Sequence, residues 1–210
     1  MARPSNTDQR RTQIAAALIK VMAKRGYDGA SIGDIAKAAR LTSGLVHYHF
    51  ESKQEILLAS LESIANSHDA RLEERMAKAH GRPLEEVGAF IDFHLGLGAD
   101  ADPEALACWI LLSGEALRSP KVRTRFESAM TSTIHRLAES IRRGVELGDF
   151  RCEDADAAAA ALVATIQGYF VLAASARSAI PKGSAARSTK QMAEGLLKPA
   201  RAFRTPAKSR

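Results

Sequence analysis

Apolar residues recur along this chain at intervals of three and four positions, the spacing that places them on one face of an α-helix. Residues 8–25 show the pattern clearly, with Ile14, Leu18, Val21 and Met22 on a single stripe. No segment alternates apolar and polar residues in the way that a half-buried strand requires. The pattern therefore predicts an all-α protein of about nine helices.

Capping residues, glycines and prolines divide this pattern into separate helices. The first three form a helix-turn-helix head, and the others form a larger C-terminal helical body. After residues 8–25, the expected helices cover 31–40, 42–50, 52–79, 84–97, 103–117, 121–147, 154–179 and 188–197. The last stretch, 199–210, is basic and is expected to be disordered, either as a solvated end or as an auxiliary DNA arm.

The second and third helices have the spacing of a helix-turn-helix motif. Ser31 and Asp34 stand in the S-x-x-D spacing of a capping box, so the second helix is expected to begin at Ser31. Ala36 and Ala39 are small enough to let the two short helices approach closely. The third helix is therefore the element of the head that is expected to contact another molecule.

A helical wheel divides the third helix, within the stretch "LTSGLVHYHFESK" of residues 41–53, into two sides. The side that can pack against the first two helices holds Thr42, Leu45, Val46 and His49. The other side holds Ser43, Gly44, His47 and Tyr48. A hydroxyl, a bare backbone, an imidazole and a phenol suit hydrogen bonds to phosphates and to base edges.

Other classes of site fit the sequence less well. His47 and His49 are two positions apart, so on a helix they point to nearly opposite sides and do not form a metal-binding pair. No metal and no cofactor are expected. An all-helical enzyme would need a nucleophile with its base, a phosphate loop or metal spacing, and none is present in the sequence. A helical scaffold that binds only protein leaves the outer side of the third helix unexplained.

The net charge of +6 is unevenly distributed along the chain. Residues 1–53 hold nine Lys and Arg against four Asp and Glu, whereas residues 54–181 hold thirteen against nineteen. Residues 182–210 hold eight against one. A basic head suits a polyanion, of which nucleic acid is the commonest, although charge alone is equally compatible with solvated faces.

The run "GYDGASIGDIAKAARLTSGLVHYHFESKQEILLASL" resembles the DNA-binding head of TetR-family transcriptional regulators. The shared pattern is a glycine turn, a Ser-started helix with an Ile-Ala pair, a short recognition helix ending in aromatic, His and Phe residues, and then a lysine before an apolar helix. The residues that carry it are Gly26, Ser31, Ile35, Ala36, Gly44, Val46, Tyr48, His49, Phe50, Lys53 and Leu57. The family often has tyrosine where this chain has His47.

The resemblance implies a set of DNA-facing residues. It comprises Ser31, Thr42, Ser43, Gly44, Leu45, His47, Tyr48, His49 and Lys53. Base-edge contacts are expected from Thr42, Ser43, Gly44 and Leu45, and phosphate contacts from the other five. Arg10 and Arg11, near the start of the first helix, are expected to add phosphate contacts.

A single short recognition helix reads only a few base pairs, whereas two copies on a two-fold axis read a palindrome. A homodimer is therefore expected, and the helices near 154–179 and 188–197 are its candidate interface, as a four-helix bundle. The alternative is that 154–179 is only the core helix of the monomer. Apolar residues occupy nearly the whole circumference of this helix, so one face can pack in the monomer core and another can contact the partner subunit.

The resemblance also implies a pocket in the body for a small-molecule inducer. Candidate lining residues are Phe90, Phe93, His94, Trp109, Glu115, Met130, His135, Gln167 and Phe170. Trp109, the only tryptophan, is the best single candidate. The stretches "CWILLSGEALRSP" and "GDFRCEDAD" resemble the body of the BetI-type branch, whose best-known member responds to choline. A cation would require Trp109 together with a carboxylate such as Glu115.

The predicted organisation is a DNA-binding domain over 1–53, a ligand-binding and dimerisation domain over 54–198, and the tail. No run approaches the roughly 18 uncharged apolar residues that a membrane helix needs. No secretory signal is expected at the N-terminus, so a cytoplasmic protein without a membrane partner is expected. Cys108 and Cys152 are expected to be reduced thiols.

The predicted function is a ligand-responsive repressor that binds a palindromic double-stranded DNA operator as a homodimer and leaves it when an inducer binds. The alternatives are an activator or a ligand-independent regulator of the same fold, and an all-helical enzyme.

Overall fold

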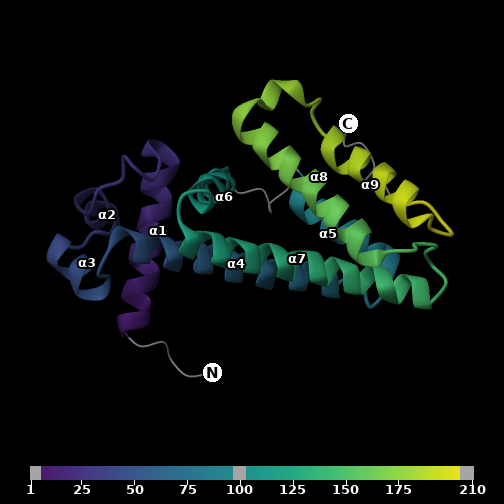
Figure 1. Cartoon of the computed structure of the whole chain (residues 1–210), viewed down its shortest axis with the longest axis horizontal. Coiled ribbons are helices and arrows are strands. Elements are labelled where there is room, and N and C mark those ends of the chain that lie inside the picture. Colours follow the sequence, from purple (N-terminus) through teal and green to yellow (C-terminus); the bar gives the residue numbers. More distant parts are fainter. Residues whose placement is uncertain (1–5, 97–102, 204–210) are drawn as a thin grey trace. The chain divides into compact units, whose positions relative to one another are not determined.

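The computed structural model describes residues 6–96 and 103–203. These residues form nine α-helices, one 3-10 turn and no strand, which confirms the all-α prediction (Figure 1). The helices are α1 (Asn6–Arg25), α2 (Ile32–Ala39), α3 (Ser43–His49), α4 (Lys53–Ala77), α5 (Pro83–Leu95), α6 (Pro103–Ala116), α7 (Pro120–Glu146), α8 (Ala155–Ser175) and α9 (Ser184–Leu197), with the 3-10 turn η1 at Arg177–Ala179.

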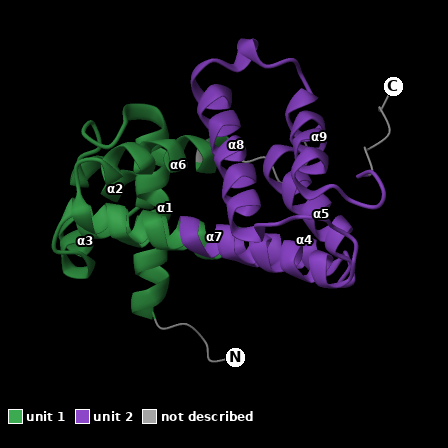
Figure 2. Ribbon diagram, turned by 45° about the vertical axis from the view of Figure 1, so that its right-hand side comes forward, with its two compact units in different colours: residues 1–68, 102–129 green, residues 69–101, 130–210 purple. Residues whose placement is uncertain are grey.

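The chain forms two compact units, and the division between them falls within α4 and α7 (Figure 2). Unit 1 takes its described residues from 1–68 and 102–129, and unit 2 from 69–101 and 130–210. The boundary predicted at residue 53 divides the chain by function, whereas these two units are divided by compactness. The units do not test that boundary, so it stays a prediction.

Unit 1 is built around an apolar core to which α1, α2, α3, α4 and α6 all contribute. Its fully buried members include Ile14 and Leu18 of α1, Ile35 of α2 and Val46 of α3. Burial of this apolar surface is the main force that holds the short helices α2 and α3 in place. Cys108 of α6 lies in the same core, where burial raises the pKa of its thiol to about 12 and keeps it unreactive at neutral pH.

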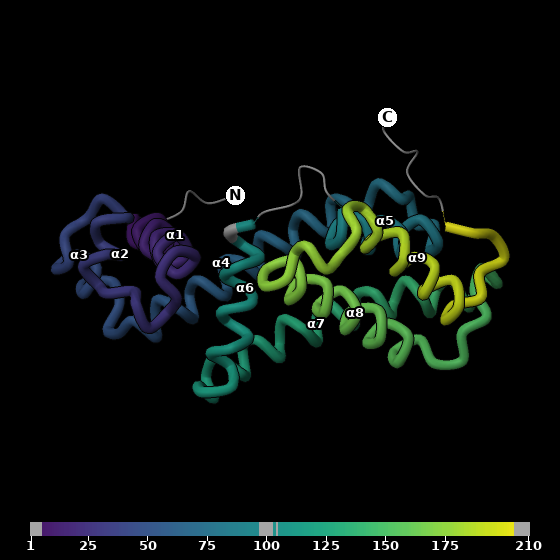
Figure 3. The backbone as a smooth tube through the Cα atoms, turned by 90° about the horizontal axis from the view of Figure 1, so that it is seen from above, coloured from purple at the N-terminus to yellow at the C-terminus, as the bar shows by residue number. Residues whose placement is uncertain are grey.

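Unit 2 has a separate core in which α5, α8 and α9 run side by side (Figure 3). Phe90 and Ile91 of α5 and Leu162 of α8 are fully buried there. Gly144 of α7 is required by packing, because a Cβ at this position would lie 2.1 Å from the Phe150 ring. Glycine therefore lets the turn after α7 fold back onto the helix.

Two ion pairs, each with one buried partner, join the helices of unit 2. Glu86 of α5 accepts a hydrogen bond of 2.7 Å from the Ser140 hydroxyl and pairs with Arg143 of α7. Asp92 of α5 lies 2.6 Å from the ammonium of Lys190 on α9, whose side chain is 5% exposed. The buried charges of Glu86 and Lys190 are tolerated because each has such a partner, and these pairs help to fix how α5 meets α7 and α9.

The start of the predicted disordered tail is instead packed against unit 2. The backbone N–H of Ala200 donates to Asp149 O at 3.0 Å, and that of Phe203 donates to a Glu194 carboxylate oxygen at 2.9 Å. Phe203 is buried among the core residues of unit 2, and Arg201 pairs with Glu85. The expectation of disorder is therefore wrong for residues 199–203, because Phe203 has a core site to fill. Residues 204–210 lie outside the described part.

Two helix ends also differ from the prediction. Helix α8 ends at Ser175 rather than near residue 179, and the tighter 3-10 turn η1 follows it. Helix α9 begins at Ser184 rather than residue 188, because Gly183 adopts a left-handed conformation, with φ of 74°, that starts the helix there. The predicted last residue of α5, Leu97, lies outside the described residues.

Helix α8 corrects the expectation that no segment is apolar and long enough to cross a membrane. By length and composition its 21 residues pass that test. One face of α8 is buried, however, with Leu162, Val163 and Ile166 in the core of unit 2. The core helix of a soluble protein passes the same test, so the composition of α8 does not indicate a membrane protein.

Candidate functional site

Helix α2 begins at the capping box predicted from the sequence. The Ser31 hydroxyl accepts a hydrogen bond of 3.1 Å from the backbone N–H of Asp34, and it donates one of 2.6 Å to the Asp34 carboxylate. The Asp34 carboxylate accepts hydrogen bonds from the hydroxyl and the backbone N–H of Ser31, and these bonds hold the pKa of Asp34 below its usual range, as does the Arg25 guanidinium 2.8 Å away. Ser31 is exposed, and its hydroxyl is occupied in the cap.

Helix α3 packs on unit 1 through one side only. Val46 is fully buried, and Phe50, the residue that ends the helix, is 2% exposed. Thr42 is the N-cap, and its hydroxyl accepts a hydrogen bond of 3.2 Å from the backbone N–H of Leu45. A cap of this kind satisfies one of the free N–H groups at the start of a helix.

The opposite side of α3 is open to solvent. Ser43, Gly44, His47 and Tyr48 are exposed, and the Tyr48 side chain is the most exposed large apolar group there, at 80%. Leu45 and His49 are half-buried at the edges of this side. Thr42 is also exposed, although the wheel placed it with the packed residues, because it precedes the helix as its cap.

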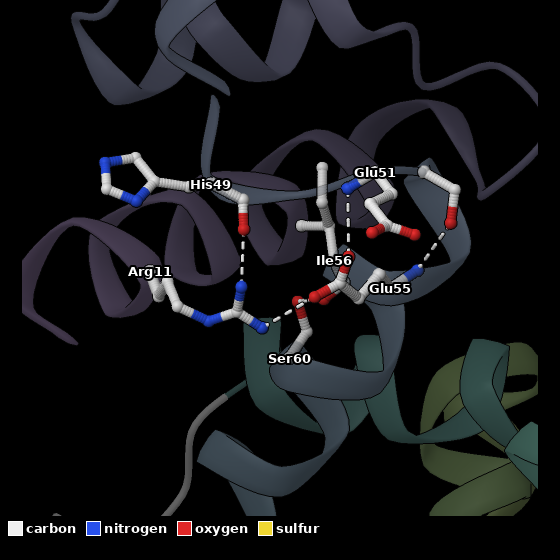
Figure 4. A network of polar contacts seen from close by, with 7 residues as sticks. Arg11, His49, Glu51, Glu55, Ile56 and Ser60 are labelled. Carbon is white, nitrogen blue, oxygen red and sulfur yellow. Dashed lines mark hydrogen bonds and ion pairs between the residues drawn. The ribbon is translucent and has the colours of Figure 1, made fainter. Parts of the chain in front are cut away.

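The Arg11 guanidinium holds the end of α3 (Figure 4). It donates to the backbone O of His49 and pairs with the Glu55 carboxylate of α4 at 2.9 Å. The same guanidinium lies 4.1 Å from the centroid of the Phe50 ring. One side chain from α1 therefore contacts the last turn of α3, the residue that caps it and the first turn of α4. The sequence suggested a phosphate contact for Arg11, but its donors are used inside unit 1.

Lys53 is similarly occupied. Its ammonium donates to Tyr27 O at 2.9 Å and to Ala30 O at 3.0 Å, and it lies 4.3 Å from the centroid of the Tyr27 ring. These contacts tie the start of α4 to the turn between α1 and α2. Two of the three N–H donors of the Lys53 ammonium are therefore used inside unit 1, and one is left for the expected phosphate contact.

A depression of about 340 Å³ adjoins the end of α3. It is lined by Arg11, His47, Tyr48, His49, Phe50, Glu51 and Glu55. Its one guanidinium is already paired, and two carboxylates share its wall, so it does not suit a phosphate. Within the described residues, no three His, Cys, Asp or Glu side chains are grouped so that they could hold a metal ion.

Four of the predicted ligand residues come together in unit 2. The His94 ring lies 4.4 Å from Phe90, 5.1 Å from Phe93 and 6.2 Å from Phe170, measured between centroids. His94 Nδ1 lies 2.7 Å from Phe90 O, a carbonyl that can only accept, so Nδ1 carries the proton. We refer to these four residues as the aromatic cluster. The Arg71 guanidinium lies 5.6 Å from the centroid of the Phe93 ring.

The other predicted ligand residues lie elsewhere. Trp109 and Glu115 belong to α6 in unit 1, where Trp109 stacks on Phe126 at 4.6 Å. Six positions apart on a helix, the two side chains point about 120° apart, so they do not suit one small cation. Met130 and Gln167 are half-buried in unit 2, and His135 is exposed, with its ring 3.3 Å from Glu139.

Sequence reasoning missed a group of polar contacts between the α6–α7 corner and the rest of unit 1. Arg118 pairs with Asp28 at 3.3 Å, and the Gln54 amide donates to the Ser119 hydroxyl at 2.9 Å. Both contacts join residues more than 60 positions apart, so no local pattern could have indicated them. They attach this corner to the turn after α1 and to the first turn of α4.

Comparisons with known proteins fit this geometry. A family model described as "Bacterial regulatory proteins, tetR family" matches residues 14–60, and one described as "BetI-type transcriptional repressor, C-terminal" matches residues 83–198. The chain is 27% identical over 136 residues to the transcriptional regulator BetI of Agrobacterium fabrum, covering 61% of this chain and 65% of that protein. It is 31% identical over 115 residues to BetI of Rhizobium meliloti, covering 54% and 55%. The matches thus span less than two thirds of these relatives.

A solved structure is similar over a larger share of the chain. A transcriptional regulator from Saccharomonospora viridis, crystallised in complex with choline, has a TM-score of 0.75 and 25% sequence identity. The match covers 94% of this chain and all of that one. The helical fold is therefore shared over most of the chain.

The Glu55 carboxylate provides a test of the network around Arg11. Hydrogen bonds from Glu51 N and from Arg11 lower the pKa of Glu55, so it stabilises the fold when it is ionised and loses this effect as the pH falls through that pKa. Glu55→Gln should cost about 0.5 kcal/mol at pH 7, a small value because both partners are more than a third exposed. The difference should shrink as the pH falls below the ordinary range of a glutamate pKa, and it should vanish once the pH is below the lowered pKa of Glu55.

Urea unfolding across this pH range measures the difference. Glu62→Gln is the control, since Glu62 lies on the same helix, is exposed and has no partner among the described residues. If the wild type and Glu55→Gln differ equally at pH 7 and pH 3.5, Glu55 does not act through its charge.

Proposed function

Since this chain belongs to the TetR family of bacterial regulatory proteins, we propose that it is a ligand-responsive transcriptional repressor that binds a palindromic DNA operator as a homodimer. The matched relatives are regulators of transcription, not enzymes. We assign DNA binding to residues 1–53, and ligand binding and dimerisation to residues 54–198. The description of the family model over 83–198 as a repressor supports repression rather than activation.

The observation that carries the proposal is the exposed outer side of α3. A seven-residue helix has its inner side fixed by Val46 and Phe50, while its outer side offers hydrogen-bonding groups to solvent. Within the described residues of unit 1, the side chains of Ser43, His47 and Tyr48 make no hydrogen bond or ion pair that would require them on that side. A helix of this size fits the major groove, where side chains near its start reach base edges and flanking groups contact phosphates.

Dimerisation is assigned to the outer faces of α8 and α9. Both helices bury one face in unit 2 and leave small or apolar residues on the other. The exposed small and apolar residues include Ala157, Ala161, Ala164, Gly168, Val171 and Leu172 on α8, and Met192, Gly195 and Leu196 on α9. Small residues allow close helix packing, and two such helices from each subunit form a four-helix bundle. This role also explains why α8 is apolar on both faces.

The inducer is assigned to the aromatic cluster of unit 2. Ring faces attract cations, and the Arg71 guanidinium already lies near Phe93. Because the S. viridis regulator was crystallised with choline, a quaternary ammonium compound is the first ligand class to test. Such a ligand releases the operator if it binds better to a conformation whose two heads do not fit the half-site spacing.

Tyr48 tests the role of α3. Tyr48→Ala removes an exposed side chain, so folding should be unaffected, whereas operator affinity should fall about ten-fold through one lost hydrogen bond to DNA. The operator is first selected from fragments of the source genome with the purified protein, and affinity is then measured by fluorescence anisotropy. Leu147→Ala, at an exposed position in unit 2, is the control. Equal affinities for the wild type and Tyr48→Ala would remove Tyr48 from the interface.

The dimer surface is tested by adding charge to it. The double substitution Leu172→Glu and Met192→Glu should convert the dimer to a monomer, because it places carboxylates in an apolar interface. Sedimentation velocity measures the change, with circular dichroism to confirm that the helices remain. Leu147→Glu is the control at an exposed leucine outside both helices. A double variant that sediments like the wild type would exclude this surface.

Choline titration tests the ligand proposal. Choline should bind the wild type and release it from the operator, and Phe170→Ala should raise the choline concentration required by about ten-fold through the lost cation–π contact. Isothermal titration calorimetry measures binding, and fluorescence anisotropy measures release. Trp109→Phe is the control, because Trp109 stacks on Phe126 within unit 1. The assignment is wrong if choline changes neither quantity, or if Trp109→Phe has the larger effect.

A further inference from the structure

The cationic side chains of the head differ in whether they have a partner. Arg11 and Arg25 are paired with carboxylates, and Lys53 donates to two backbone carbonyls. The side chains of Lys37 and Arg40, by contrast, are exposed and make no hydrogen bond or ion pair within the described part of the chain. Lys37 lies in the last turn of α2, and Arg40 caps the end of that helix directly before the turn that leads into α3.

The backbone at Arg40 is unusual for its residue type. Arg40 ends α2 in the left-handed conformation, with φ of 56° and ψ of 43°, where glycine is normally preferred because it has no Cβ. Two hydrogen bonds hold the turn: Leu41 N donates to Ala36 O at 2.9 Å, and the Gln13 amide donates to Ala39 O at 2.7 Å. The base of the Arg40 side chain is therefore held in one position.

Strain alone does not indicate a function, because Lys198 at the end of α9 has the same backbone conformation, with φ of 44°. A cation at a helix C-terminus is also favourable for the helix dipole at both places. Arg40 and Lys198 differ in where they lie relative to α3. Arg40 lies two residues before the α3 cap Thr42, so their Cα atoms are at most about 7 Å apart. Lys198 lies in unit 2.

We propose that Arg40 binds the phosphodiester backbone of duplex DNA beside the groove that α3 enters, with Lys37 adding to the positive charge on the same turn. This inference rests on the proposed DNA-binding function and names a contact for it. The planar guanidinium binds two phosphate oxygens at once, and the fixed turn reduces the conformational freedom lost on binding. The acidic residue of α2, Asp34, is paired with Arg25 and so does not compete for Arg40.

Arg40→Gly separates DNA contact from helix stability. Glycine removes the charge and relieves the left-handed backbone, so the variant should fold as well as the wild type and still bind DNA more weakly. Affinity for a random-sequence duplex at low salt should fall about ten-fold. The slope of log affinity against log salt should become shallower by about one per chain. Arg40→Lys should keep the slope of the wild type.

Lys198→Gly is the matched control, since it makes the same change in charge and backbone at a helix end in unit 2. It should leave affinity and slope unchanged. Fluorescence anisotropy with the random duplex measures both, and thermal unfolding confirms that each variant is folded. The inference is overturned if Arg40→Gly keeps the wild-type slope, or if Lys198→Gly lowers affinity equally. If the wild type itself does not bind the duplex, the proposed function fails as well.

Discussion

Helix α3 has seven residues, too few to persist in water without tertiary contacts, because helix nucleation fixes several residues for each hydrogen bond gained. Its geometry therefore depends on what holds it. Val46 and Phe50 bury its inner side, Thr42 caps its start, and the Arg11 guanidinium holds its last turn against α1 and α4. These contacts give the outer side a fixed shape, which a surface that reads DNA requires.

The need to hold α3 in place also explains why some cationic side chains of the head are paired inside unit 1. Some cations are needed inside unit 1: Arg11 joins three helices, and Lys53 closes the turn between α1 and α2. Cations that serve the fold in this way have fewer donors left for a partner. The long-range attraction for DNA then depends on those without internal partners, among which Arg40 is nearest to α3 along the chain.

Much of this arrangement could be predicted from the sequence, because it depends on local rules. Helical spacing indicated the all-α fold, and the S-x-x-D signature located the start of α2. The wheel correctly separated buried Val46 from exposed Ser43, Gly44, His47 and Tyr48. It misplaced Thr42, since the helix begins one residue later and leaves Thr42 as an exposed cap.

The features that were missed depend on contacts between distant residues. Arg11 reaches a residue 38 positions away, and the sequence offered only its charge. Phe203 lies in a polar, basic stretch typical of a disordered end, yet it fills a site in a core made by helices from the rest of unit 2. The predicted pairing of Trp109 with Glu115 overlooked that these residues point in different directions from α6.

The central claim is that the outer side of α3 and the cations near it bind DNA. The most direct test is the affinity of the purified wild-type protein for a random-sequence duplex, measured against salt concentration. The account predicts clear binding at low salt and a steep linear fall of log affinity with log salt, because neutralised phosphates release counterions. Absence of binding at low salt, or an affinity that does not change with salt, would contradict it.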